Sequence, residues 1–216
     1  MSQTIDTQQS IEIIQAMAKA ITDQQAYLSS LDSTVGDGDH GLNMAKALRE
    51  AAKQVGELEN PTLETVWGTA GKAVQNSVGG ASGLLFGAFF IGASGTLKEK
   101  EFLTMTDIAE MLAAGLANVQ KRGKAQSGDK TMVDALAPAV TVAQAALNDG
   151  LSMSEFLGSI AQAAHSGTEA TREMIAKHGR AKFLGERSLG HQDAGATSLA
   201  IMLMAWAETV LQGGQP

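Results

Sequence analysis

The sequence predicts an all-α protein, an antiparallel up-and-down bundle of eight helices with a ligand site at one rim. Apolar residues recur at three–four spacing, alanine is abundant while β-branched runs are rare, and no segment alternates as a half-buried strand does. The 216 residues, 44% of them hydrophobic, are enough for a sizeable core. We expect a single domain over residues 1–212 and a flexible tail at 213–216.

Apolar spacing and capping signals locate each helix along the chain. Ile11, Ile14, Ala18, Ile21 and Leu28 share one face of the first helix. Asn60-Pro61 is a cap followed by proline at a first helical position, Thr104-x-x-Asp107 resembles a capping box, and Ser152-x-x-Glu155 is one. The predicted helices cover 8–30, 42–55, 62–77, 82–97, 105–121, 131–148, 153–178 and 195–212.

Alternate loops of an up-and-down bundle lie at the same end. The second, fourth and sixth loops have unremarkable sequences. The first, third, fifth and seventh loops hold half of the 24 glycines. These four loops cover 32–41, 77–83, 122–131 and 179–195. We therefore predict one composite site, built from four glycine-rich loops at one rim.

Three aspartates lie close together in the first of these loops. Asp32, Asp37 and Asp39 flank a turn with the sequence GDGDHG. Carboxylates this close repel one another unless they are solvated or share a cation, and Mg²⁺ is commonly bound by carboxylates together with substrate phosphates. The cluster predicts a Mg²⁺ site that also holds phosphate. The alternative is that Asp37 and Asp39 only form the turn and cap a helix.

The other loops offer groups suited to phosphate. Ser82 and Thr131 stand near helix starts, where a hydroxyl caps the helix or contacts phosphate, and free N–H groups attract anions. Lys130 and Arg180 are candidate phosphate cations. His40 is either a cap residue or a ligand contact. Such a site suits phosphoryl transfer, in which the protein mainly positions groups and neutralises charge.

The chain has three further histidines, and two apolar residues lie in the seventh loop. His165 and His178 are predicted to be structural, and His191 is left open. Phe183-Leu184 are apolar in a loop, where they fold over a ligand, pack down, or contact a partner. Partner contact is our working hypothesis.

Several classes of protein are excluded. GDGDHG matches G-x-G-x-x-G, but no strand precedes it, and an EF-hand fails because Leu48 occupies the twelfth position. No Walker A sequence or nucleophile elbow occurs, and the absence of cysteine removes disulfide and thiolate chemistry. A net charge of −7 argues against nucleic acid. The polar N-terminus and the short apolar run Leu84–Ile91 predict a cytoplasmic protein without a membrane span.

Four motifs carry a resemblance to a known family, and they occur in its order over essentially the whole chain. The sequence resembles the nucleotide-binding L subunits of bacterial dihydroxyacetone kinases. The matching segments are 36–44 (GDGDHGLNM), 77–83 (SVGGASG), 128–132 (GDKTM) and 185–193 (GERSLGHQD). The more distant nucleotide domain of fatty-acid kinases is less similar, because it has Thr where His40 stands.

The resemblance implies an eight-helix antiparallel barrel with the nucleotide at one rim. It implies that Asp32, Asp37 and Asp39 coordinate two Mg²⁺ ions that bridge to the phosphates of ADP or ATP. Two positions depart from the usual pattern: Ala194, where proline is common, and Gly38, where alanine is common. The nucleotide-contacting positions that it implies are His40, Gly41, Leu42, Asn43, Ala81, Ser82, Gly123, Met132, Arg180, Asp193, Ala194 and Gly195.

The resemblance also implies partners. The family's sugar is bound covalently to a histidine of a separate K subunit, so this chain is expected to supply the phosphoryl donor and no catalytic acid or base. Either ADP stays bound as a coenzyme and the phosphocarrier M subunit of a phosphotransferase system rephosphorylates it, or ATP exchanges in each cycle. A related keto-sugar as substrate, and contact with a transcription regulator, remain open.

Overall fold

The computed structural model describes residues 4–213, and within them it confirms the all-α prediction. Extended pairing in this range is limited to one isolated antiparallel bridge, between Ile5 and Leu103. The α-helices are α1 (Thr7–Asp23), α2 (Gln25–Val35), α3 (His40–Gly56), α4 (Leu63–Ser77), α5 (Gly80–Ser94), α6 (Met105–Gly123), α7 (Met132–Ala145), α8 (Met153–Ala170) and α9 (Ala194–Gly213). Short 3₁₀ segments are η1 (Ala146–Asn148), η2 (Thr171–Glu173) and η3 (Ala181–Ser188).

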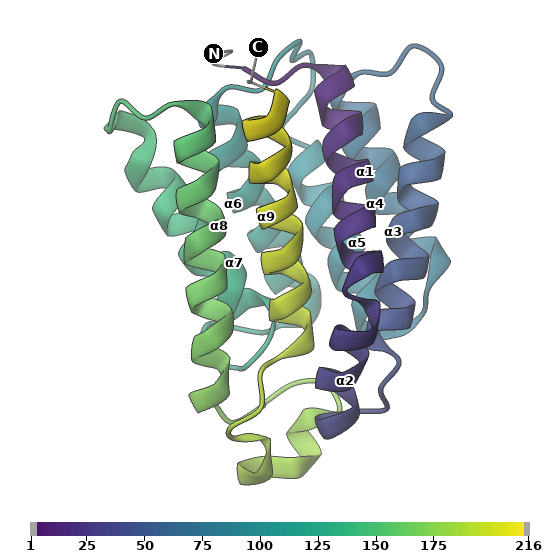
Figure 1. Cartoon of the computed structure of the whole chain (residues 1–216), viewed down its shortest axis with the longest axis vertical. Coiled ribbons are helices and arrows are strands. Elements are labelled where there is room, and N and C mark those ends of the chain that lie inside the picture. The colour runs from purple at the N-terminus through teal and green to yellow at the C-terminus, as the bar shows by residue number, and fades with distance from the viewer. Residues whose placement is uncertain (1–3, 214–216) are drawn as a thin grey trace.

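The helices form a closed antiparallel ring. Each helix from α3 to α9 packs on its neighbour in the sequence, α1 packs on α3, and α9 returns to pack on α1. The start of α1 and the end of α9 lie at one end of the ring, while α2 and the segment between α8 and α9 lie at the other (Figure 1). The expected up-and-down barrel is therefore confirmed, with α1 and α2 together taking one position in the ring.

Aromatic side chains fill the interior of the ring. Trp67 of α4 lies 4.9 Å from Trp206 of α9 and 5.9 Å from Phe90 of α5, measured between ring centroids. All three side chains are almost fully buried. Large aromatic residues remove the most apolar area from water, so both contacts stabilise the interior. The Trp67–Trp206 contact joins helices that are distant in sequence, α4 and α9, and helps to hold the ring closed.

The predicted capping boxes open helices as expected. Thr104 accepts a hydrogen bond from the Asp107 amide (3.2 Å), and the Asp107 carboxylate accepts one from the Thr104 amide (2.8 Å). Ser152 and Glu155 make the same reciprocal pair at the start of α8. These caps satisfy N–H groups that the first helical turn leaves free.

Two of the predicted helices differ clearly from the structure, and the others differ by smaller shifts at their ends. The first predicted helix breaks at Gln24, whose ψ of 10° is non-helical, so that α2 leaves the line of α1. Helix α2 continues to Val35, five residues beyond the predicted end at residue 30, so Asp32 lies in its last turn and not in a loop. The seventh predicted helix ends at Ala170, eight residues early. At the C-terminus α9 includes Gly213, and the rest of the expected tail, 214–216, lies outside the described residues.

Helix α9 is the one described helix that is long and apolar enough to cross a membrane by length and composition. Within the ring, 61% of its most apolar window is buried. It packs against α1, α7 and α8. A helix in the core of a protein can be equally long and apolar, and the packing of α9 identifies it as such a core helix.

Candidate functional site

A cavity of about 670 Å³ opens at the end of the ring that carries α2 and η3. Its wall draws on all four of the predicted glycine-rich loops and on the helix ends beside them. Ten of the twelve candidate nucleotide residues line it, namely His40, Asn43, Ala81, Ser82, Gly123, Met132, Arg180, Asp193, Ala194 and Gly195.

The other two candidates, Gly41 and Leu42, do not line the cavity. Leu42 is 53% exposed on the outside of α3. Gly41 is buried where α3 meets α2, and a Cβ there would lie 2.1 Å from the Gln25 carbonyl oxygen. Glycine at position 41 is therefore explained by the close approach of two helix backbones.

The three aspartates converge at the rim of this cavity. One carboxylate oxygen from each of Asp32, Asp37 and Asp39 lies within 4.8 Å of the others. Asp39 occupies the N-cap position of α3, but its side chain makes no capping hydrogen bond. A capping role for Asp39 is thus not supported. Carboxylates at this separation repel one another where no cation screens them, so their chemistry fits a divalent cation bound by oxygen ligands.

Two glycines allow the carboxylates to meet. Gly38 has a φ of +77°, which side chains other than glycine rarely adopt. A Cβ at Gly36 would lie 2.3 Å from an Asp32 carboxylate oxygen. Larger residues at these two positions would therefore distort the turn or displace the Asp32 carboxylate.

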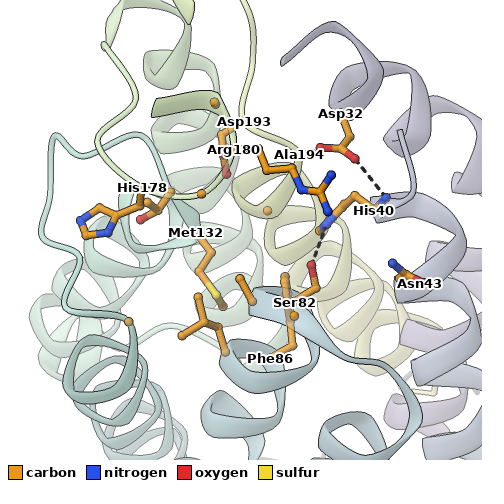
Figure 2. A pocket seen from close by; sticks show the side chains of 18 of the residues that line it. Asp32, His40, Asn43, Ser82, Phe86, Met132, His178, Arg180, Asp193 and Ala194 are labelled. Atoms are coloured by element: carbon orange, nitrogen blue, oxygen red, sulfur yellow. Dashed lines mark hydrogen bonds between the residues drawn. The ribbon is translucent and has the colours of Figure 1, made fainter. Parts of the chain in front are cut away.

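His40 joins three helices beneath the cluster. Its amide donates to the Asp32 carboxylate (3.2 Å), and its ring nitrogens bond the hydroxyls of Ser82 on α5 (3.1 Å) and Ser198 on α9 (2.8 Å). Figure 2 shows the contacts to Asp32 and Ser82. Burial lowers the pKa of His40 below 6.5, although Asp32 and Asp39 oppose this shift. The imidazole is therefore neutral near pH 7, and each of its two nitrogens is hydrogen-bonded to one of the two hydroxyls.

Ser198 was missed by the sequence reasoning. It is fully buried in the first turns of α9, inside an apolar helical pattern that gives a serine no particular signal. Its importance follows only from its contact with His40, a residue 158 positions away.

The start of α5 presents free backbone donors to the cavity. Its N-cap residue is Gly79, which has no side chain to cap the helix, and the next residue, Gly80, has a φ of +74°. Both line the cavity together with Ser82. An uncapped helix start next to a cation site is suited to a phosphate group. Phe86 and Met132 add an apolar wall.

The candidate phosphate cations have different surroundings. The Arg180 side chain extends toward His40 in the close-up view (Figure 2). Its guanidinium pairs with the Asp37 carboxylate, with 2.6 Å between Nη1 and Oδ2. Lys130 is buried and bonds three backbone carbonyls, which leaves none of its N–H groups for phosphate. Thr131 caps α7 by accepting from the Val133 amide (3.2 Å), so its hydroxyl takes the capping alternative.

Asp193 closes the far wall of the cavity and starts α9. Its carboxylate accepts from the Ala196 amide (2.7 Å) as an N-cap does. Burial raises the pKa of the Asp193 carboxyl to about 6.

Among the remaining histidines, His178 lies outside any helix and contacts the Asp129 carboxylate (3.2 Å).

Comparison with known proteins gives a consistent picture. The family model described as "DAK2 domain" matches residues 34–208. The ADP-binding subunit DhaL of the PEP-dependent dihydroxyacetone kinase 2 of Listeria innocua is 40% identical, with 86% of this chain and 87% of that protein covered. DhaL of the PTS-dependent dihydroxyacetone kinase of Lactococcus lactis is 37% identical, with 96% and 98% covered.

A solved structure extends the comparison to three dimensions. It is the dihydroxyacetone kinase from C. freundii in complex with AMP-PNP and Mg²⁺, which superposes with a TM-score of 0.72 at 32% sequence identity. The match covers 92% of this chain and 33% of that one.

Proposed function

The chain belongs to the DAK2 domain family, and from this we propose that it is the nucleotide-binding, phosphoryl-donor subunit of a kinase for dihydroxyacetone or a related keto-sugar. Relatives named as ADP-binding subunits match it over nearly their whole length. The single observation that carries the proposal is the convergence of Asp32, Asp37 and Asp39 at the rim of a cavity of about 670 Å³.

In this proposal the three carboxylates hold Mg²⁺, and we infer two ions. Bound there, Mg²⁺ screens the nucleotide phosphates from the carboxylates and from one another. The three aspartates suit Mg²⁺, because each offers a negatively charged oxygen and these oxygens lie within 4.8 Å of one another. A related solved structure was obtained with AMP-PNP and Mg²⁺, which supports the choice of ligand.

The nucleotide is proposed to occupy the cavity beside this site. The free N–H groups of Gly80 and Ala81 at the start of α5 bind a phosphate, and the Ser82 hydroxyl is within reach of the same position. Arg180 supplies a guanidinium, which suits phosphate oxygens better than an ammonium does. The apolar side chains of Phe86 and Met132 are suited to pack against the nucleotide's base.

The work of this chain is then to position the phosphoryl group. His40 is neutral and bonded on both ring nitrogens, so it orients its neighbours and moves no proton. No acid or base on this chain is assigned to the reaction, since phosphoryl transfer depends mainly on alignment and charge neutralisation. We propose that the sugar is held on a separate K subunit in the cytoplasm.

The proposed source of the phosphoryl group is supported by the names of two relatives. One is named PEP-dependent and the other PTS-dependent. We accordingly propose that ADP stays bound as a coenzyme and that a phosphocarrier M subunit of the phosphotransferase system rephosphorylates it. The test is to dialyse the purified protein in Mg²⁺ and measure retained ADP by native mass spectrometry. Retention supports a coenzyme, and complete loss supports exchange of ATP instead.

A reconstituted reaction tests the activity itself. The protein is mixed with its K partner, dihydroxyacetone and either a phosphorylated carrier or ATP, and sugar phosphate is measured. Formation of sugar phosphate with one donor is the expected result. Nucleotide binding without sugar phosphate under either donor would contradict the kinase assignment and leave a regulatory binding module, such as one that contacts a transcription regulator.

A further inference from the structure

We propose that Lys130 is a positioning residue: it fixes both ends of the segment between α8 and α9 and thereby sets Arg180 over the cavity. Lys130 itself touches no phosphate in this account. The inference rests on the proposed function, because it assumes that Arg180 contacts the nucleotide phosphates.

The environment of Lys130 is unusual for a lysine. The residue is 3% exposed, and its ammonium donates to the carbonyl oxygens of Thr171 (2.7 Å), Met174 (3.1 Å) and His191 (2.5 Å). An ammonium has three N–H donors, so these contacts use all of them. A buried charge is costly unless it is paired or fully hydrogen-bonded, and here neutral carbonyls provide the bonds. Burial also lowers the pKa of Lys130.

The three carbonyls flank the stretch that carries Arg180. Thr171 and Met174 precede it, and His191 follows it. The two ends are also bonded to each other, since the Gly190 amide donates to the Arg172 carbonyl (2.8 Å) and the Asp193 amide to the Thr171 hydroxyl (3.0 Å). One ammonium at the start of α7 therefore determines where the segment leaves α8 and where it rejoins α9.

The residue before Lys130 extends this attachment toward Arg180. The Asp129 carbonyl accepts from the Lys177 amide (3.1 Å), and its carboxylate bonds Lys177 Nζ (2.9 Å) and His178 Nε2 (3.2 Å). The attached stretch thus reaches to within two residues of Arg180. From there the guanidinium extends to Asp37 on the opposite wall. An arginine placed in this way loses its alignment if the segment shifts by about 1 Å.

Two other roles for Lys130 make different predictions. A direct phosphate contact would add to the contribution of Arg180, because each cation would then bind independently. A role in global stability alone would lower the resistance to unfolding without a specific effect on nucleotide affinity. A positioning role predicts that the effect of Lys130 on affinity depends on Arg180 being present.

A double-mutant cycle separates these roles. Mg-ADP affinity is measured by calorimetry for the wild type, Lys130→Met, Arg180→Ala and the double variant. The control is Lys98→Met, because Lys98 is an exposed lysine at the opposite end of the ring. We expect Lys130→Met to bind about ten-fold more weakly, the size of one charge-assisted hydrogen bond. The double variant should match Arg180→Ala within about two-fold. Additive losses, or unchanged affinity in Lys130→Met, would overturn the proposal.

Amide hydrogen exchange in nucleotide-free protein gives a second readout. Exchange should accelerate at 172–190 in Lys130→Met and stay unchanged within α4 and α5. If Lys130→Met does not fold, both measurements use Lys130→Arg, for which smaller changes of the same kind are expected. Unchanged exchange at 172–190 would contradict the proposal. If the wild type fails to bind Mg-ADP, the proposed function is wrong, while the exchange result still tests whether Lys130 holds the segment.

Discussion

Replacing Asp193 by asparagine is expected to stabilise the nucleotide-free protein near neutral pH. Burial raises the pKa of this carboxyl from 3.8 to about 6, because ionisation is costly away from water and the nearby Asp134 adds repulsion. Between these two pH values the folded state holds a proton that the unfolded state has lost. The free energy of unfolding therefore falls as pH rises from 3.8 to about 6.

The size of the effect follows from the shift. A difference of roughly two pH units corresponds to about 3 kcal/mol at pH 7. This is an upper limit, because the Asp193 residue as a whole is partly exposed at the cavity wall although its carboxyl is enclosed. Asparagine cannot ionise, yet it accepts the same bond from the Ala196 amide and is as good an N-cap as aspartate. The variant should recover most of this free energy.

Urea unfolding at several pH values between 4 and 7.5 measures the effect. The wild type should lose stability across this range relative to Asp193→Asn, and the two curves should converge near pH 4. Asp149→Asn is the matched control, since Asp149 is exposed at the opposite end of the ring. A difference between Asp193→Asn and wild type that does not change with pH would refute the reasoning.

Further predictions concern packing, the buried histidine and the rim. Gly41→Ala should lower the free energy of unfolding in urea by about 2 kcal/mol or more, because its Cβ would lie 2.1 Å from a backbone oxygen of α2. Its control is Gly158→Ala, which has open space around it and should raise the free energy of unfolding by about 0.5–1 kcal/mol. Ser198→Ala removes a bond to buried His40 and should cost about 1–3 kcal/mol in the same assay. Phe183 is 78% exposed beside the rim, so Phe183→Glu should weaken K-subunit binding in sedimentation experiments and leave Mg-ADP affinity unchanged.

The sequence was sufficient for the parts of the fold that depend on local signals. Apolar spacing located the helices, and capping boxes such as Ser152 with Glu155 marked their starts. Counting the helices assigned four glycine-rich loops to one end, and those loops do line one cavity. These inferences succeed because periodicity and capping are read from neighbouring residues.

The errors arise where distant residues decide the structure. Helix α8 ends early in a region where the Thr171 and Met174 carbonyls bond to Lys130, some 40 positions earlier in the chain. The same contacts remove Lys130 from the candidate phosphate cations. The break at Gln24 has no glycine or proline to mark it. Ser198 gains its role only through the closing of the ring, which brings α9 next to α3 and so places Ser198 beside His40.

The central claim is that Asp32, Asp37 and Asp39 bind the nucleotide through Mg²⁺. Calorimetric titration of ADP in Mg²⁺ and then in excess chelator tests it most directly, with wild type, Asp37→Asn, Asp39→Asn and the control Asp149→Asn. We expect ADP to bind the wild type and the control only with Mg²⁺, and we expect both cluster variants to lose binding. Equal ADP affinity in chelator, or normal affinity in both cluster variants, would contradict it.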